Sequence, residues 1–466
     1  MSEKVVFGTP GGEPFLDGNV ARRSAPLWCN AAPPQHKGTS VTVRPSSVAV
    51  VTDRSSVRPE LRGRILALVA IVCAALNLRL VVTSLSPLLT TVGEEFGFAA
   101  TVVGVFGTLP LVAFAIFGLV TPAIMRRLGP EATAALSMLL TGAGQVLRAF
   151  APDTGTLLVL TGVALTGAAL GNVVLPPLIK QYFPDRIAAL STVQMVAIHV
   201  GALFPPLVAV PLAEVAGWRA ALGAWSFLAL AAAVLWTVQW RRPGTVPRAA
   251  VPSGGPALAR PIWRVGMAWR MALLFGMVTW NVFTLFTWLP ALLNDAGHSA
   301  AMAGSMVSLM VGTSLLFGLV APTVTLRAAN TFPIVALGLS GYGIGYLGVA
   351  AAPEYAPLWV LFLGMGTSLF VVVMTMINAR SATPQGAAAL SGFVQGAGSG
   401  IALGGPLLFG LFGELTGGWT LSYVLIAGGS LVVAAVVAYA ERTPWTIEAA
   451  AQGRHPDRRA DELLHD

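Results

Sequence analysis

The feature that most constrains this chain is a succession of long apolar runs between about residues 62 and 441. A helix that crosses a bilayer needs roughly 20 mostly apolar residues. In lipid a single span satisfies its backbone hydrogen bonds within itself, so Gly, Pro and Asn inside the runs do not exclude helix. The sequence therefore predicts an all-α integral membrane protein of twelve transmembrane helices. The runs lie at about 65–90, 101–124, 132–150, 156–179, 188–212, 219–240, 267–292, 301–325, 332–351, 357–379, 387–411 and 419–440.

Composition agrees with a chain whose solvent is mostly lipid. Hydrophobic residues make up 55% of the 466 residues, charged residues only 10%, and the mean hydropathy is +0.75, outside the range of water-soluble domains. The net charge of +8 does not indicate nucleic-acid binding, because the basic residues form no stripe that follows a phosphate backbone. Two cysteines, Cys29 and Cys73, are too few for a disulfide framework.

Breaks between the runs predict five parts. Residues 1–61 are rich in Pro, Ser, Gly and Arg and contain no apolar core, so we expect a disordered tail. Two six-helix halves follow, at 62–240 and 267–441. The Pro-, Gly- and Arg-rich segment 241–266 is typical of a linker, and 442–466 is expected to be a second tail.

Basic residues gather on the linker side of the predicted spans. That side carries Arg126, Arg127, Lys180, Arg186, six arginines from Arg241 to Arg270, Arg327 and Arg380. The opposite loops have only Arg148 and Arg219, beside Glu94, Glu95, Asp153, Glu214, Asp295, Glu354 and Glu414. The positive-inside rule then predicts a multi-pass protein of the cell membrane with both termini and the linker in the cytoplasm.

The two halves repeat each other at an offset of about 200 residues. Matching positions include the Phe-Gly-Leu-Val runs at 117–120 and 317–320, Lys180 and Arg380, Pro206-Leu207 and Pro406-Leu407, and Glu214 and Glu414. Parallel repeats of this kind build transporters whose solute site lies between the halves near the middle of the bilayer.

Several local motifs also point to a family. Those motifs are Asn77-Leu78-Arg79 with Thr83-Ser84, Gly171-Asn172-Val173 through Pro176 to Lys180, Phe183-Pro184-Asp185-Arg186, Ala389-Leu390-Ser391-Gly392 to Gln395, and Gly405-Pro406 with Gly417-Gly418-Trp419. They resemble the cyanate permease and 2-nitroimidazole transporter family of the major facilitator superfamily, over about residues 62–441. The resemblance implies the twelve-helix major facilitator fold and transport by alternating access.

Two departures from the superfamily's patterns matter. Arg126 stands where the loop between the second and third spans usually has an Asp, so a latch that relies on this acid is not expected. The Gly-Pro pattern that resembles drug antiporters occurs around Gly404–Pro406 in the eleventh span instead of the fifth. The sequence therefore favours drug antiport less than transport of a small polar or anionic solute.

Arg79 is the strongest candidate for solute binding. It lies near the middle of the first span, where a guanidinium costs a few kcal/mol, and all twenty acidic residues fall in tails, loops or span ends. We expect it to coordinate an anion on a helix face shared with Thr83 and Ser86. The alternative is an arginine satisfied by helix-end carbonyls or polar neighbours.

Other polar and aromatic residues inside the spans have two interpretations each. His199 is the midplane side chain suited to titrate near neutral pH, so it either relays a proton or makes an interhelical hydrogen bond. Trp280, Thr284 and Trp288 share a face of the seventh span and form a cavity wall or, more simply, pack. Amides are costly in lipid and are expected to face the interior, to bind solute or a neighbouring helix: Asn77, Asn172, Gln194, Asn281, Asn378 and Gln395.

The sequence predicts a secondary active transporter for a small polar or anionic solute such as cyanate, with the proton as candidate coupling ion. The alternative is efflux of small heteroaromatic compounds or drugs. An enzyme would need a metal cluster, a carboxylate pair or a nucleophile with its base in the spans, whereas the middle of the spans offers one histidine and no acid. A receptor would need an output domain, and the predicted tails contain no apolar core. We therefore expect neither an enzyme nor a receptor. We expect a monomer without cofactor or metal, whose partners are the solute and the lipid bilayer.

Overall fold

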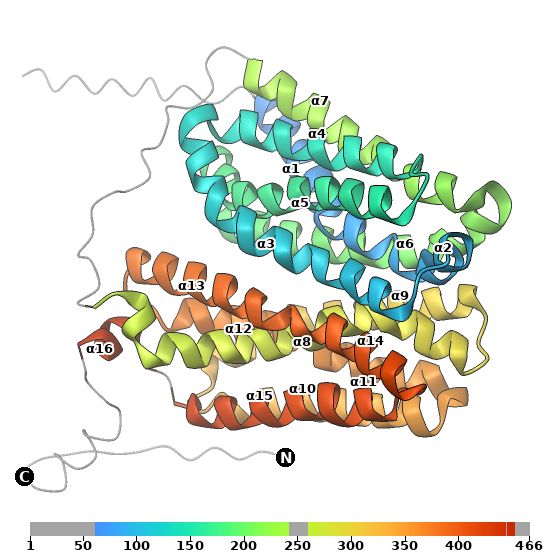
Figure 1. Cartoon of the computed structure of the whole chain (residues 1–466). Helices are drawn as coiled ribbons and strands as arrows, with labels where there is room; N and C mark the ends of the chain where they lie inside the picture. Colours follow the sequence, from blue (N-terminus) through green and yellow to red (C-terminus); the bar gives the residue numbers. More distant parts are fainter. Residues whose placement is uncertain (1–60, 242–259, 444, 453–466) are drawn as a thin grey trace, which may run out of the picture. The chain divides into compact units, whose positions relative to one another are not determined.

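The helices of the computed structural model fall into the two predicted halves. The model describes residues 61–241, 260–443 and 445–452, all within one contact unit. Figure 1 shows the helices of each half running alongside one another, the first half in blue to green and the second in yellow to red. The expected N-terminal tail with Cys29, most of the linker, and residues 453–466 lie outside the described residues.

The first half consists of α1 (Leu61–Thr83), η1 (Ser86–Leu88), α2 (Leu89–Phe96), α3 (Ala100–Leu128), α4 (Pro130–Arg148), α5 (Thr154–Tyr182), α6 (Ile187–Gly223) and α7 (Ser226–Arg241). The second half consists of η2 (Ile262–Arg264), α8 (Gly266–Asp295), α9 (Ala300–Arg327), α10 (Phe332–Ala351), η3 (Pro353–Tyr355), α11 (Ala356–Thr367), α12 (Leu369–Ala379), α13 (Pro384–Ala402), α14 (Gly404–Thr416), the π-helical η4 (Ser422–Gly428), α15 (Gly429–Ala440) and α16 (Ile447–Ala451).

Ten helical segments of the described residues are long and apolar enough, by length and composition, to cross a membrane. One of them, the 53-residue segment Ala189–Arg241, holds two crossings, because the chain turns at Gly217 with a φ of 81°. The remaining crossing is α4, whose 19 residues reach roughly 28 Å, close to the hydrocarbon thickness. Its hydropathy is lowered by polar side chains that are buried: Thr133, Ser137, Thr141 and Gln145. The all-α membrane fold with twelve crossings is confirmed.

The internal repeat has a structural counterpart at the end of each half's fifth crossing. Trp218 Nε1 donates to the carboxylate of Glu95, and Trp419 Nε1 donates to Asp295 Oδ2 at 2.8 Å. Glu95 and Asp295 each follow the first crossing of their own half, at an offset of 200. The same tryptophan-to-carboxylate hydrogen bond therefore ties the first and fifth crossings together in both halves.

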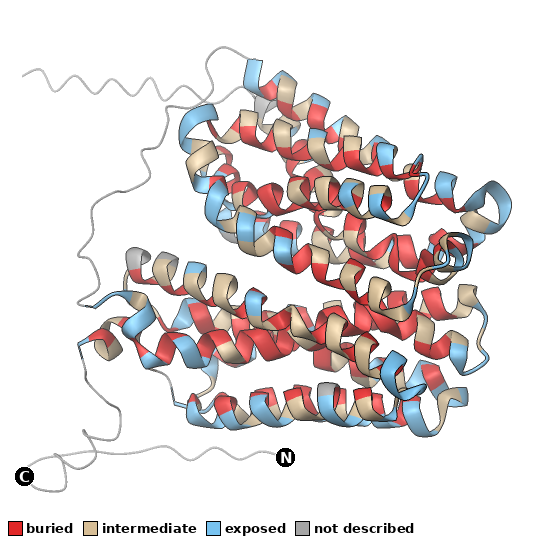
Figure 2. Ribbon diagram, viewed as in Figure 1, coloured by how far each residue is buried: buried red, intermediate tan, exposed pale blue. Residues whose placement is uncertain are grey.

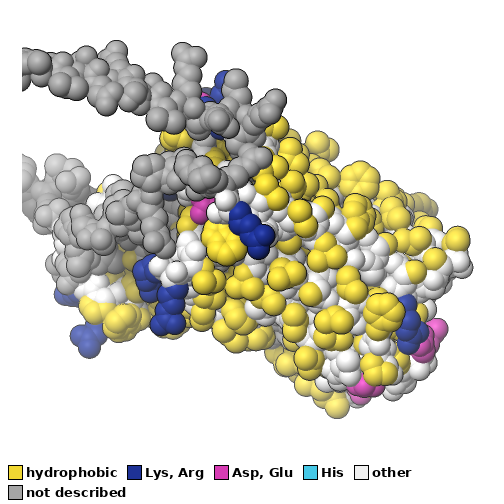
Figure 3. All heavy atoms as spheres, turned by 90° about the horizontal axis from the view of Figure 1, so that it is seen from above, with side chains coloured by type: hydrophobic (Ala, Val, Ile, Leu, Met, Phe, Trp, Pro, Cys, Tyr) yellow, Lys and Arg dark blue, Asp and Glu magenta, His cyan; other side chains and the backbone are white. Residues whose placement is uncertain are grey.

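Large apolar side chains cover the outer surface of the helices. Phe150, Val215, Leu347 and Leu415 are each at least 71% exposed. Figure 2 shows the buried positions on the inward faces of the helices, with α8 buried along most of its length. In Figure 3 the middle of the face is largely hydrophobic and charged side chains gather toward its two ends. This surface suits a lipid environment.

Contacts between the halves gather at the end opposite the linker. Thr101 N donates to Glu414 Oε2 at 3.1 Å, and Ser308 Oγ donates to the carbonyl of Leu203 at 2.6 Å. At Gly304 a Cβ would lie 2.4 Å from the carbonyl oxygen of Pro206, so the backbones of α9 and α6 nearly touch. The halves are therefore closed on each other at this end.

Arg148 differs from its expected place in an outer loop. It is the last residue of α4 and fully buried, with Nη2 donating to Ser84 Oγ at 2.8 Å and Nη1 donating to Val81 O at 3.4 Å. The reason is the end of α1 at Thr83, because the last carbonyls of a helix lack intrahelical partners. Asn378 is a second difference: it was expected in the interior and is exposed near the end of α12.

Candidate solute site

A cavity of about 310 Å³ lies between the two halves. Its walls come from α1, α3 and α5 of the first half and from α8, α12 and α13 of the second. The lining parts of α3 and α5 are toward their C-terminal ends, and that of the crossing formed by α13 and α14, Ala389–Thr416, is toward its N-terminal end, so the cavity lies nearer the linker than the contacts that close the opposite end. This is the position predicted for a solute site between repeats.

Arg79 lines this cavity and is surrounded by aromatic rings. Its Cζ lies 5.8 Å from the ring centroid of Phe114, 5.6 Å from that of Phe283 and 5.5 Å from that of Phe370. Nη1 is buried and has no hydrogen-bond partner. Among the described residues, none of the ion pairs involves Arg79. Cation–π attraction offsets part of the cost of this charge, by about 0.5–2 kcal/mol per ring, but leaves N–H donors unused.

Two of the predicted amides line the same cavity. Asn172 reaches it from α5, and Gln395 from α13, where Gln395 Nε2 donates to Ser391 Oγ at 2.7 Å. The structure thus brings Arg79, Asn172 and Gln395 together from three helices. A planar cation and two amides offer both donors and acceptors to a small solute.

Sequence reasoning missed several lining residues. Thr279 has a buried hydroxyl without a partner, and Ser399 lies on the cavity side of α13. The repeat held a signal for both, because Thr279 is offset by 200 from Arg79 and Ser399 by 200 from His199. The three phenylalanines carried no signal of this kind.

The face expected to join Arg79, Thr83 and Ser86 is not formed. Thr83 is fully buried and its hydroxyl donates to Arg79 O at 3.2 Å, and α1 ends there. Ser86 lies in η1 and donates to the carbonyl of Phe286. Because α1 ends at Thr83, three residues before Ser86, the helical spacing that predicted a common face does not extend to Ser86.

Asn77 and Asn281 hydrogen-bond away from the cavity lining. Asn77 Nδ2 donates to Cys73 O at 2.8 Å. Asn281 Nδ2 donates to Met277 O at 2.8 Å and to Ser430 Oγ of α15 at 2.9 Å. Neither amide lines the cavity around Arg79, and the interhelical bond of Asn281 matches the simpler of the two predicted roles.

His199 does not line the cavity either. A ring nitrogen of His199 is 2.9 Å from the carbonyl oxygen of Met195, one turn earlier in α6. The imidazole is half-buried.

The tryptophans of α8 pack against α14. A Cβ at Gly404 would lie 2.4 Å from the Trp280 ring, and Trp288 Nε1 donates to Pro406 O at 2.8 Å. Trp288 also packs on Trp419, with ring centroids 5.2 Å apart. The aromatic wall expected from Trp280, Thr284 and Trp288 is thus a helix-packing surface, and the rings that do wall the cavity are phenylalanines.

Sequence comparison places the chain among transporters. A sequence model of the Major Facilitator Superfamily matches residues 67–363. The chain is 32% identical over 375 residues to the 2-nitroimidazole transporter of Escherichia coli (strain K12), a match that covers 80% of this chain and 94% of that protein. It is 26% identical over 370 residues to the cyanate transport protein CynX of the same organism, covering 77% and 93%.

Solved structures agree on the fold. A mutant of the nucleoside transporter NupG superimposes with a TM-score of 0.66 at 14% identity, covering 80% of this chain and 98% of that chain. A D-xylose-proton symporter gives 0.62 at 15% identity, covering 83% and 98%. With two halves, a shared cavity and named transporters as homologues, the chain belongs to the Major Facilitator Superfamily and is a membrane transporter related to the cyanate and 2-nitroimidazole transporters, not an enzyme.

Proposed function

We propose that this transporter moves a small polar or anionic solute, such as cyanate, by binding it at Arg79 in the cavity between the halves. The observation that carries the proposal is a half-buried arginine whose Nη1 is buried without a hydrogen-bond partner, which faces a cavity and has no acidic partner among the described residues. An unpaired charge away from water is costly. An anion that accepts from this planar fork would neutralise it.

The alternative solute is a small heteroaromatic compound. Phe114, Phe283 and Phe370 bring ring surfaces to the Arg79 site, and aromatic rings stack favourably on such surfaces. The relative named for 2-nitroimidazole transport is also more similar in sequence than the one named for cyanate. The cavity lining comes from both halves of one chain, which supports a carrier that works as a monomer.

An exchange assay with purified protein in liposomes distinguishes between these two proposed solutes. Vesicles are loaded with unlabelled cyanate, and entry of labelled cyanate by exchange is compared with protein-free vesicles. We expect exchange above that background, competed by other small planar anions. Exchange of 2-nitroimidazole without any exchange of cyanate would favour the heteroaromatic alternative, and exchange of neither would contradict the proposed function.

His199 is proposed to supply any proton coupling, because imidazole titrates near neutral pH and the acidic residues lie outside the middle of the spans. Replacing His199 with Gln is expected to remove the pH dependence of uptake while exchange of solute continues. His298→Gln is the control, since His298 lies beyond the C-terminal end of α8 and bonds to Pro353 O at 2.8 Å. An unchanged pH profile in the His199 variant would show that this histidine is structural.

Both termini and the linker are proposed to lie in the cytoplasm of a cell whose plasma membrane holds the protein. The excess of basic residues on the linker side supports this orientation. Cys73 is half-buried within α1, and Cys29 lies outside the described residues. A membrane-impermeant maleimide is expected to label neither cysteine in intact cells and to label Cys29 after permeabilisation. Labelling of Cys29 from outside would reverse the orientation.

A further inference from the structure

The segment after the last crossing folds back onto the second half. It was expected to be part of the tail 442–466, but α16 (Ile447–Ala451) contacts α8 and α13. Ile447 is fully buried and Ala451 is 1% exposed. The backbone N–H of Ile447 donates to the carbonyl of Arg380, in the loop that leads into α13, at 2.9 Å. This short helix is therefore packed as part of the domain.

Glu448 of α16 holds the start of α13. Its Oε2 accepts from Ala382 N at 3.0 Å, and its Oε1 accepts from Thr383 N at 3.0 Å and from Thr383 Oγ1 at 2.8 Å. Thr383 is the N-cap of α13, and its hydroxyl oxygen accepts from Gly386 N at 3.0 Å. A Cβ at Gly386 would lie 2.1 Å from Glu448 Oε1. The carboxylate thus approaches a helix N-terminus, where negative charge is stabilising, through a gap that glycine leaves.

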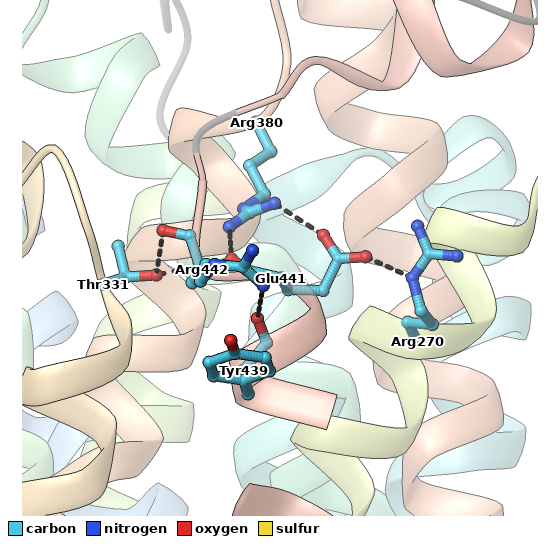
Figure 4. Close-up of polar contacts among 6 residues, drawn as sticks. All are labelled: Arg270, Thr331, Arg380, Tyr439, Glu441 and Arg442. Atoms are coloured by element: carbon cyan, nitrogen blue, oxygen red, sulfur yellow. Dashed lines mark hydrogen bonds and ion pairs between the residues drawn. The ribbon is translucent and has the colours of Figure 1, made fainter. Parts of the chain in front are cut away.

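A buried ion cluster anchors the base of this segment (Figure 4). Glu441 pairs with Arg270 of α8 and, at 2.6 Å, with Arg380, and the side chains of Glu441 and Arg380 are 4% and 3% exposed. The next residue, Arg442, accepts a hydrogen bond at its carbonyl from Thr331 N at 3.0 Å. Arg380 was expected only as one of the basic residues on the linker side, but it is buried here because it pairs with Glu441, an acidic residue 61 positions further along the chain.

The helix that α16 holds carries polar residues of the solute cavity. Ser391, Gln395 and Ser399 follow one another at four-residue spacing on α13 and all line the cavity, as expected for one helix face. α13 ends at Ala402, and α14 begins at Gly404, where Trp280 packs. Movement of the N-terminal end of α13 about this junction would therefore displace the cavity's polar wall.

We propose that Glu448 is a positioning residue for transport: through α16 it holds the linker-side end of α13 in the arrangement that keeps the cavity open toward the linker, and its release allows α13 to close that side. The inference rests on the proposed function only in treating this cavity as the solute path. It does not depend on which solute binds Arg79.

The test uses purified protein in detergent and needs no solute. A cysteine is placed in the cavity by Ser391→Cys in a background with Cys29→Ser and Cys73→Ser, and its labelling rate with a soluble maleimide is measured. Glu448→Gln removes the acceptor charge and is expected to slow labelling about fivefold, since hydrogen bonds to charged groups are among the stronger ones. Glu354→Gln, which changes an exposed glutamate before α11, is the matched control and should leave the rate unchanged.

A second variant disturbs the contact between Glu448 and the start of α13 by a change in α13 itself. Gly386→Ala places a methyl group where Glu448 Oε1 now lies, so it should slow labelling of the Ser391 cysteine as Glu448→Gln does, without altering the glutamate. Size-exclusion profiles and the unfolding midpoint verify that each variant is folded. Unchanged or faster labelling in folded variants would overturn the positioning role. The proposed function is tested separately by the exchange assay in liposomes. If the wild-type protein exchanges no solute while the Glu448 variant still slows labelling, the proposed function fails and the positioning role of Glu448 stands.

Discussion

Replacement of Arg79 with Gln is expected to lower uptake of an anionic solute by roughly 10- to 100-fold. The reason is the loss of hydrogen bonds to a charged group, which contribute about 1.5–3 kcal/mol, at about 1.4 kcal/mol for each factor of ten. Arg79→Lys keeps the charge but loses the planar fork, so its uptake should lie between the wild type and the Gln variant. Initial rates of labelled cyanate uptake into liposomes measure both effects.

The same variant should also lose its preference for charge. Wild-type protein is expected to prefer an anion over a neutral solute of similar size, and its unfolding midpoint should rise when anion is added, by mass action. Both effects should be absent in Arg79→Gln. Arg327→Gln is the control, because Arg327 is an exposed cation at the end of α9. Unchanged uptake and an unchanged preference in a folded Arg79→Gln protein would show that Arg79 is structural.

Replacement of Arg380 with Met should destabilise the fold by about 3–5 kcal/mol, the range found when one partner of a buried ion pair is removed. Arg380 and Glu441 are almost fully buried. Burial lowers the pKa of the Arg380 guanidinium, and the Glu441 carboxylate opposes this change. Without Arg380, the Glu441 carboxylate would keep only Arg270, whose side chain is 45% exposed. Denaturant unfolding in detergent measures the loss.

Two further variants identify the cause of that destabilisation. Combining Arg380→Met with Glu441→Met removes both buried charges and should recover much of the lost stability, since apolar replacements of a buried pair are often neutral. Arg126→Met, at an exposed position near the end of α3, should change stability little. Equal losses in the single and double variants would mean that Arg380 stabilises the fold by packing and not by its charge.

Part of the candidate site followed from sequence. Arg79 could be identified because a cation within an apolar span has a high free-energy cost wherever the helix packs. Asn172 and Gln395 could be identified for the same reason, although the cost of an amide in lipid is smaller. Phe114, Phe283 and Phe370 were not, because an aromatic residue in an apolar run is equally suited to lipid, core or cavity. His199 and Asn281 have polar side chains that could bind a solute, but neither lines the cavity. His199 contacts the carbonyl of Met195 instead, and Asn281 donates to Met277 O and Ser430 Oγ.

The sequence by itself determined the twelve crossings, the two repeated halves and the central cation, because these depend on local hydropathy, on run length and on an offset visible in the chain. Only the tertiary structure decided where polar groups find partners. Arg148 is buried because α1 ends beside it, and Glu448 caps α13 although 65 residues separate it from Thr383. Such partners lie far apart in the chain, and neither hydropathy nor helical spacing carries information about contacts between distant segments.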